Sequence, residues 1–372
     1  MEIVTIDKVV YNGYGLGKLN GKIIFVDNVL PAEEIVVDIY KDKKNFSYGK
    51  LVEIRKPSPY RVLPECPLFN NCGGCQWQHI EYDFQVILKR DILLENLKRI
   101  GKLKDIPDIE IIKSKEYHYR NRARFHVKNG KIGFYKKLSN EFVEINHCKI
   151  LNDNINDFIK GLKLNNRIKK LDIFSSNSGE ILSTLNKDYV YNKIGSWKYR
   201  ISKNSFFQSN EFLIEKLINI VLEHCKGYEK FADLFSGVGL FTIPLSEKFC
   251  NGVSIEFSKS SFYDCLENLK INKINNVKVF KKRVEKSGEI LKLFQPDIVV
   301  VDPPRGGIKK DSCEILKSIE NIKKIIYVSC NPITLSRDLQ LLSSKFHLQK
   351  LFLIDMFPQT FHLETLAILI KK

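Results

Sequence analysis

The chain has 372 residues, with 60 lysines and arginines against 43 acidic residues, so its formal net charge is +17. This length is enough for two or three domains with buried cores, and the hydrophobic content of 44% argues against intrinsic disorder. So large a positive charge favours a polyanionic partner, most often nucleic acid, although a lysine-rich coding bias is the alternative explanation.

Targeting signals and membrane spans are not apparent in the sequence. No apolar run approaches the roughly 20 residues that cross a bilayer. The first residues also lack the basic and then apolar pattern of a signal peptide. We therefore expect a cytoplasmic protein with no membrane partner. In that reducing compartment its nine cysteines favour metal binding, catalysis or burial over disulfides.

Residues 2–56 form short alternating segments that are separated by turn clusters at 12–17 and 20–21. This pattern predicts a small β-barrel. Residues suited to phosphate contacts and base stacking lie in its turns, although a merely solvated surface is the alternative. They are Lys18, Lys22, Lys41, Lys43, Lys44, Tyr14, Phe46 and Tyr48. Residues 57–59, Pro-Ser-Pro, are typical of a linker.

Three cysteines then fall within ten residues, at Cys66, Cys72 and Cys75, with two glycines between the last two. Thiolates so close together predict a site for a soft metal, and Cys148 is the best candidate for a fourth ligand. The spacing alone does not separate zinc from an iron–sulfur cluster. Unligated structural cysteines are a third possibility.

Residues 83–101 show helical spacing of apolar positions, a basic last turn and a terminal glycine, which predicts an amphipathic helix. Residues 117–125 interleave aromatic side chains with arginines, which suits a strand that faces RNA. A salt-bridged sheet face explains the same pattern. The arginines are Arg120, Arg122 and Arg124. From there to about residue 203 the pattern predicts mostly strands.

A helix is predicted at 211–225, and alternating strands and helices follow it. Residues 231–241, FADLFSGVGLF, read as a strand, a glycine turn and the start of a helix. Glycines in such a turn let a ligand approach the backbone closely. The next strand ends at Glu256, about twenty residues further on, where a doubly wound fold places the acid that binds a ribose hydroxyl.

Two further apolar runs, 298–301 and 325–328, predict buried parallel strands. Asp302 follows the first in a DPPR turn, and Cys330 follows the second in SCNP. Because ligands bind at the carboxyl edge of such sheets, the acid and the thiol should face one crevice. Cys330 as a small buried filler is the alternative. With this methyltransferase-like DPPR turn, the cofactor looks like S-adenosylmethionine rather than a dinucleotide.

The chain ends in two strands that we expect at the sheet edge, joined by a turn at residues 358–360. This turn should bring His362 and Glu364 back toward the crevice. Glu364 as an ordinary exposed strand residue is the alternative.

Together these motifs resemble the RNA uridine-5-methyltransferases, particularly the iron–sulfur branch that modifies large-subunit ribosomal RNA. The resemblance covers nearly the whole chain. It implies an α/β fold whose C-terminal part is a doubly wound, Rossmann-like S-adenosylmethionine methyltransferase domain. Before it come a TRAM/OB-like β-barrel that binds RNA and a central, mostly β iron–sulfur domain. The predicted domains are 1–58 for the barrel, 59–82 with 117–204 for the iron–sulfur domain, and 83–116 with 205–372 for the catalytic domain.

The resemblance also implies roles for single residues. Cys330 matches the family nucleophile and Glu364 the base. The implied contacts to S-adenosylmethionine come from Gln208, Phe235, Glu256 and Asp302. The implied ligands of a [4Fe–4S] cluster are Cys66, Cys72, Cys75 and Cys148. The chain departs from many relatives at Leu240, at Arg283, where an acid or amide often reads adenine, and at Ala32, where glycine is usual.

The implied reaction is methylation of uridine C5 in 23S ribosomal RNA, which gives 5-methyluridine. It runs through a covalent Cys330–C6 adduct and removal of the C5 proton by Glu364. The alternatives are transfer RNA as substrate, a cytosine-5 or exocyclic-amine methyltransferase, and a ribosome-assembly factor with secondary catalysis. An amine enzyme would not need Cys330, and an assembly factor would not need Glu364. We expect a monomer.

Overall fold

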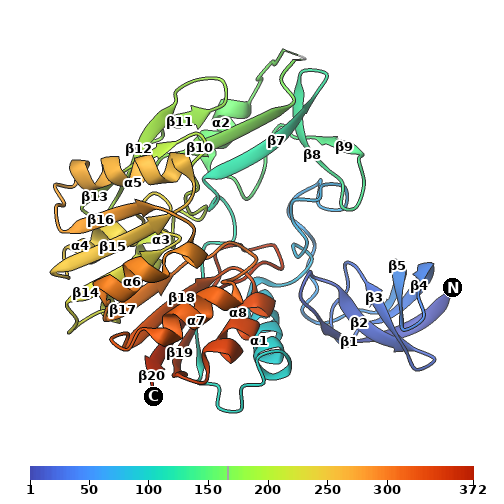
Figure 1. Ribbon diagram of the computed structural model, residues 1–372. Coiled ribbons are helices and arrows are strands. Elements are labelled where there is room, and N and C mark those ends of the chain that lie inside the picture. The colour runs from blue at the N-terminus through green and yellow to red at the C-terminus, as the bar shows by residue number, and fades with distance from the viewer. Residues whose placement is uncertain (166) are drawn as a thin grey trace. The chain divides into compact units, whose positions relative to one another are not determined.

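The computed structural model describes residues 1–165 and 167–372 (Figure 1). They form two compact units. Unit 1 comprises Met1–Glu95, Phe134–Glu144 and Phe357–His362, and unit 2 comprises Asn96–Gly133, Ile145–Met356 and Leu363–Lys372. None of the helices in the described ranges combines the length and the apolar character needed to span a membrane.

A closed five-stranded barrel forms the first part of unit 1, as the alternating segments predict. Its strands follow the order β1-β2-β3-β5-β4 around the barrel. Their bounds are β1 Glu2–Val9, β2 Gly15–Leu19, β3 Lys22–Val26, β4 Glu34–Asp42 and β5 Phe46–Lys56. Alternate residues point inward, so that Ile24 and Val26 are fully buried in the barrel core while Phe25 between them lies outside it.

The other segments of unit 1 are joined by the buried side chain of Gln85 on helix α1 (Tyr82–Arg99). Its amide nitrogen donates to the carbonyls of Trp77 and Ile80 and to Gln359 Oε1, at 3.2, 2.9 and 3.0 Å. The Gln359 N–H donates back to Gln85 Oε1 at 3.0 Å. The N–H groups of Gln76 and Trp77 both donate to the Gln359 carbonyl. Residues 357–362 are therefore held by α1 and by the segment that carries the first three cysteines.

An eight-stranded sheet forms the larger part of unit 2, in the order β16-β15-β14-β17-β18-β20-β19-β6. The first five of these strands run parallel, and β20 is antiparallel to both its neighbours. The strands are β6 Ile109–Ile112, β14 Lys230–Leu234, β15 Asn251–Glu256, β16 Val277–Lys281, β17 Ile298–Val301, β18 Lys324–Ser329, β19 Phe346–Ile354 and β20 Glu364–Lys371. The helices that alternate with them are α3 Ile214–Glu223, α4 Thr242–Ser246, α5 Lys259–Ile271, α6 Gly288–Phe294, α7 Lys310–Ser318 and α8 Pro332–Leu342.

This arrangement confirms the doubly wound sheet but corrects the place of the last two strands. They pair with each other as expected, yet β20 lies between β18 and β19, and the edge strand beyond β19 is β6. β6 is four residues long and sits between charged and turn-forming residues. So short a run carries no clear period, because its strand conformation depends on the parallel partner that tertiary structure supplies.

The rest of the chain is mostly strand, as predicted for residues 117–203. A five-stranded sheet has the order β11-β10-β7-β8-β9, and β12 and β13 form a separate hairpin. The bounds are β7 Arg122–Lys128, β8 Lys131–Tyr135, β9 Phe142–Glu144, β10 Lys170–Ser175, β11 Ile181–Ser183, β12 Tyr189–Ile194 and β13 Trp197–Ser202. The short helix α2 (Asp153–Ile159) was not predicted. Its N-cap is Asn152, whose side chain accepts the N–H of Ile155.

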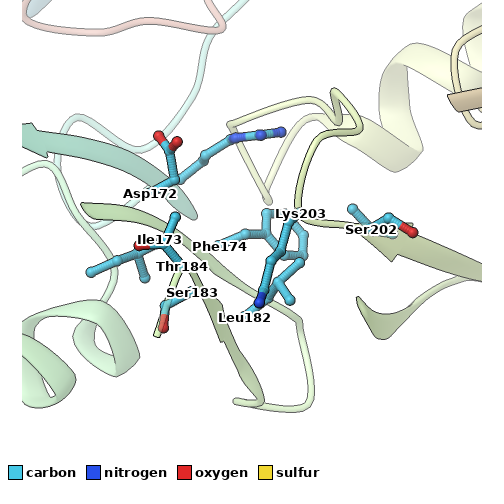
Figure 2. A pocket seen from close by; sticks show the side chains of 10 residues that line it. Asp172, Ile173, Phe174, Leu182, Ser183, Thr184, Ser202 and Lys203 are labelled. Atoms are coloured by element: carbon cyan, nitrogen blue, oxygen red, sulfur yellow. The ribbon is translucent and has the colours of Figure 1, made fainter. Parts of the chain in front are cut away.

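The arginines of β7 are largely committed to partners within the protein. Arg124 donates from Nε and Nη2 to the two carboxylate oxygens of Asp172 on β10, at 2.5 and 3.2 Å. Arg122 donates to the Ser205 carbonyl at 2.7 Å. Arg122 and Asp172 also line a small pocket with residues of β10, β11 and β13 (Figure 2). For Arg124, the salt-bridged sheet face is therefore the interpretation that the structure supports.

Candidate active site

The loop that carries Asp302 is held by hydrogen bonds to Asp338 on α8. Asp338 is buried, and its Oδ2 accepts the Ile308 N–H at 2.9 Å and the Tyr327 hydroxyl at 2.6 Å. Gly307 lies in the left-handed region at φ 72°, and a Cβ there would come within 2.3 Å of that same oxygen. Only glycine fits this close approach, so the DPPRGG turn is held firmly against α8.

The segment that carries Cys330 is joined to the same loop. Asn331 is the N-cap of α8: its side-chain oxygen accepts the Ile333 N–H, and its nitrogen donates to the Arg305 carbonyl at 3.0 Å. The Thr334 hydroxyl donates to the same carbonyl at 3.2 Å. The turns after β17 and β18 thus form one connected rim, with half-buried Cys330 beside Asp302.

Glu364 reaches this rim from the antiparallel strand. Thr365 pairs with Ser329 in the β18–β20 ladder, so Glu364 lies at the end of β20 that meets the carboxyl end of β18. Only 3% of Glu364 is exposed. The sheet topology therefore brings Asp302, Cys330 and Glu364 to the same rim, as the sequence predicts.

These three groups lie close enough to oppose one another's ionisation. Burial and the neighbouring charges of Glu364 and Asp302 raise the pKa of Cys330 to about 12, and the positive charge of Arg305 opposes this rise. Burial raises the pKa of Asp302 to about 7, against a stabilising hydrogen bond from Gln208. Burial and then Asp302 hold the pKa of Glu364 well above its usual value. A site that disfavours anions in this way is suited to a cationic ligand, which would reverse the effect.

Gln208 is placed at the rim by a network around Asp264 on α5. This buried carboxylate accepts hydrogen bonds from Arg200, from the backbone and hydroxyl of Ser202, and from the Ser205 hydroxyl, at 2.5 to 2.8 Å. Three residues after Ser205, the buried Gln208 amide lies 3.5 Å from Asp302 Oδ2. Asp264 was not predicted, because nothing in a helical sequence pattern shows which loop a buried acid will bind.

The glycine turn follows β14 and wraps around Glu256. Phe235 adopts φ 62°, a conformation that costs energy for a bulky residue, and its N–H donates to the Ile255 carbonyl. Glu256 accepts the Gly237 N–H on one oxygen and the Ser258 N–H on the other, at 2.8 and 2.5 Å. Each carboxylate oxygen keeps a free lone pair for a further donor.

Two buried polar atoms at this turn have no hydrogen-bond partner among residues 1–165 and 167–372: Asp233 Oδ1 and Ser236 Oγ. Burial is the main cause that raises the pKa of Asp233 to about 7. Unpartnered groups of this kind fit a polar ligand bound over the glycine turn. Beyond Glu256, the Arg283 guanidinium lies 4.4 Å from the ring centre of Phe257, whose surface is 56% exposed.

The predicted cluster ligands fall in different units. Cys66, Cys72 and Cys75 belong to unit 1 and Cys148 to unit 2. Burial raises the pKa of the Cys72 thiol, with a further contribution from Cys66, and the Gly74 N–H lies 3.4 Å from its sulfur. Across the described chain, no three His, Cys, Asp or Glu side chains are placed to hold a metal ion. Metal binding by these cysteines stays a prediction.

Comparison with known families assigns the chain to one of them. Residues 131–372 match the model of the tRNA (uracil-5-)-methyltransferases, and residues 3–52 match the TRAM domain. The chain belongs to the tRNA (uracil-5-)-methyltransferase family. It is thus an RNA (uracil-5-)-methyltransferase with an N-terminal TRAM domain, and its TRAM match coincides with the closed barrel.

Relatives of similar length support this assignment. A protein from Aquifex aeolicus, described as an uncharacterized RNA methyltransferase, is 34% identical and covers 98% of this chain and 97% of its own. One from Bdellovibrio bacteriovorus with the same description is 31% identical over 98% and 93% of the two chains. The crystal structure of Pyrococcus abyssi tRNA (uracil-54, C5)-methyltransferase with S-adenosyl-L-homocysteine has the same fold, with a TM-score of 0.80 and 24% identity over 99% and 100% of the chains.

Proposed function

We propose that this enzyme methylates C5 of uridine in 23S ribosomal RNA, with S-adenosylmethionine as methyl donor and Cys330 as covalent nucleophile. The observation that carries the proposal is the meeting of Cys330, Glu364 and Asp302 at one rim of the sheet. A thiol with a buried acid is what substitution at C5 of a pyrimidine requires.

The first step is attack by the Cys330 thiolate on C6 of the target uracil. The new S–C6 bond moves the electrons of the C5–C6 double bond toward C5 and O4, which makes C5 nucleophilic. C5 would then take the methyl group as the bond from that group to the donor sulfur breaks, with the electron pair left on that sulfur, and C5 would still carry its proton. Glu364 removes that proton, the double bond forms again, and the S–C6 bond breaks. The proton passes to the carboxylate, the electron pair returns to sulfur, and 5-methyluridine is released.

When bound, S-adenosylmethionine supplies the methyl group and a positive charge at its sulfonium. The residues around the glycine turn fit such a ligand, since Glu256 has acceptor sites left for ribose hydroxyls and Asp302 and Gln208 lie together at the rim. A cation near Asp302 favours the ionised forms of the groups around it. Cys330, with a pKa raised to about 12, therefore ionises more readily once the cofactor site is filled.

The target uridine has to leave its stack to reach Cys330, because the C6 position is inaccessible inside a helix. The net charge of +17 provides attraction for the RNA backbone that offsets this cost. Transfer RNA is the second candidate substrate, and it is favoured by the name of the matching family.

Mapping 5-methyluridine in ribosomal and transfer RNA from a deletion strain tests the choice of substrate. A single 23S position that loses the modification and regains it with purified enzyme supports the proposal. Loss confined to transfer RNA would contradict it.

We also propose that Cys66, Cys72, Cys75 and Cys148 hold a [4Fe–4S] cluster. The support is their residue type, the close spacing of three of them, and the electrostatic effect of Cys66 on Cys72. Anaerobically purified protein should be brown and contain about four irons per chain. Stoichiometric zinc without iron in such a preparation would contradict the proposal.

A further inference from the structure

The loop between β19 and β20 is longer than a tight hairpin. Ile354 and Glu364 are the last ladder pair of these two strands, so residues 355–363 join them. Tight hairpin loops have about two to five residues and need little support beyond their own strands. The β18–β20 ladder begins at Thr365. The backbone of Glu364 is therefore placed by β19 and by the loop that leads into it.

Thr360 closes this loop just before Glu364. Its hydroxyl donates to the Phe357 carbonyl at 2.8 Å and accepts the His362 N–H at 3.2 Å. Thr360 is only 2% exposed, so solvent has little access to these two bonds. His362 is followed by Leu363, which is fully buried, and then by Glu364. One side chain thus joins the first and last parts of the turn that leads into Glu364.

The centre of the turn formed by residues 357–362 has an unfavourable conformation. Gln359 has φ 66°, in the left-handed region that residues other than glycine rarely adopt. Its N–H donates to Gln85 Oε1, and its Oε1 accepts from Gln85 Nε2, both at 3.0 Å. Its carbonyl accepts the N–H groups of Gln76 and Trp77, at 3.1 and 3.0 Å. Backbone strain that several bonds maintain at a buried position indicates a functional constraint.

A second residue of α1 binds the start of the same turn. Lys89 follows Gln85 by one helical turn, so both side chains leave the same face of α1. Lys89 is completely buried, and its Nζ donates to the Phe357 carbonyl at 3.0 Å. Burying a lysine amine is unfavourable unless it is hydrogen-bonded. Two buried polar side chains of one helix therefore serve to hold the 357–362 turn.

We propose that Gln85 and Thr360 are positioning residues that hold Glu364 in place for removal of the C5 proton. In that step the electron pair of the C5–H bond forms the C5–C6 double bond again, and the pair of the S–C6 bond returns to Cys330. The base has to lie within hydrogen-bond reach of the proton, at about 2.6 to 3.2 Å. A displacement of about 1 Å that originates far from the reacting atoms can slow a step by about a hundredfold. This inference rests on the proposed role of Glu364 as the base.

The test separates methyl transfer from product release in a single turnover. The full-length enzyme is mixed with RNA from the deletion strain and with S-adenosylmethionine that carries a labelled methyl group. Total label in RNA measures methyl transfer, and label in RNA that runs free of protein on denaturing gels measures release. Gln85→Met should leave methyl transfer and S-adenosylmethionine affinity nearly unchanged and should slow release by about tenfold or more.

A second pair of variants tests the turn itself. Thr360→Val keeps the shape of the side chain but removes the hydroxyl, so it should also slow release. Thr360→Ser keeps the hydroxyl and should restore the release rate. The matched control is Arg61→Met, which removes the ion pair with Glu33 and weakens unit 1 at the barrel. Below its unfolding temperature this variant should show both rates of the parent.

Release at the parental rate in either folded variant, or equal slowing of methyl transfer and release, would overturn the inference. Slow release in Arg61→Met would also overturn it, because general destabilisation would then explain the effect. Glu364→Gln is measured alongside. Rapid release in that variant means that the proposed base is wrong, whereas a trapped complex in Glu364→Gln with rapid release in Gln85→Met rejects only the positioning roles.

Discussion

Two buried glutamates, Glu33 in unit 1 and Glu364 in unit 2, show that the same buried side chain can have opposite electrostatic surroundings. Glu33 is completely buried, and its oxygens accept hydrogen bonds from the backbone of Leu30 and Ser58 and from Nε and Nη2 of Arg61, at 2.6 to 3.2 Å. Glu364 is almost as buried, yet burial and the like charge of Asp302 raise its pKa well above the usual value. Burial alone therefore does not mark a functional acid.

The difference lies in what surrounds each carboxylate. A buried charge that is paired and fully hydrogen-bonded is stable as an ion and joins chain segments. A buried acid beside another acid is kept protonated until a proton transfer or a cationic ligand changes the balance. Glu33 thus fixes the end of the barrel, whereas the surroundings of Glu364 suit the proton exchange that we propose for it.

The largest expected effect separates the roles of Glu364 and Cys330. Glu364→Gln keeps the shape of the site and permits attack and methyl transfer, but the C5 proton remains. Turnover should fall by about a hundredfold or more. A methylated protein–RNA complex should then persist on denaturing gels.

Two further variants serve as controls for this prediction. Cys330→Ala should form neither product nor complex, and Glu33→Gln should turn over normally once its stability is taken into account. Normal turnover of Glu364→Gln with no trapped complex would return Glu364 to the role of an ordinary strand residue.

The next prediction concerns a variant without Arg61, the ion-pair partner of Glu33. Arg61→Met leaves Glu33 buried with its main charged donor gone, and breaking a buried pair in this way costs about 3 kcal/mol. Denaturant unfolding should show that loss. The double variant Arg61→Met/Glu33→Gln should recover part of it, and no recovery would mean that the pair does not act as a unit.

A smaller effect depends on pH at the rim that carries Asp302. Asp302 has a folded pKa raised to about 7 against an ordinary value of 3.8, so its protonated form is favoured by folding. The stability that this gives is complete below about pH 4 and is lost as the pH rises toward 7 and above. Each pH unit between the two pKa values contributes at most about 1.4 kcal/mol to this loss.

Asp302→Asn cannot ionise and should escape that loss. It should be more stable than the parent at pH 8 and similar to it at pH 4, as measured by unfolding in urea. Parallel stability curves for the two proteins across this range would show that Asp302 is not held protonated.

The smallest effect concerns the turn before Glu33. Ala32 adopts φ 65°, so this turn keeps the left-handed conformation although glycine is absent. That conformation is unfavourable for alanine, and the greater freedom of unfolded glycine offsets part of the gain from relieving it. Ala32→Gly should therefore stabilise the protein by about 0.5 kcal/mol. A destabilised variant would indicate that the alanine methyl has packing contacts of its own.

Much of the geometry of the rim could be predicted because it depends on local signals. Asp302 and Cys330 follow apolar runs that can only be buried strands, and parallel strands end at a common edge. The antiparallel partner that brings Glu364 there was predicted from its turn. These inferences needed the order of strands along the chain and little else.

The parts that could not be predicted depend on partners far away in sequence. Asp338 and Asp264 look like ordinary helical acids, but each is the buried acceptor that fixes a functional loop. β6 is a strand only because β19 lies beside it. For Arg124 the sequence allowed two interpretations, and the choice required knowing that Asp172 lies opposite on β10.

The segment of residues 357–362 gives unit 1 an unusual order of assembly. The barrel strands, α1 up to Glu95 and the cysteine-bearing segment all precede it by more than 250 residues, yet Gln85, Gln76 and Trp77 form their hydrogen bonds with Gln359. During synthesis the barrel can close early, because its five strands are complete by Lys56. The hydrogen bonds of Gln85 cannot be completed until Gln359 has been translated. The barrel and the cysteine-bearing segment are therefore translated well before the residues that complete unit 1.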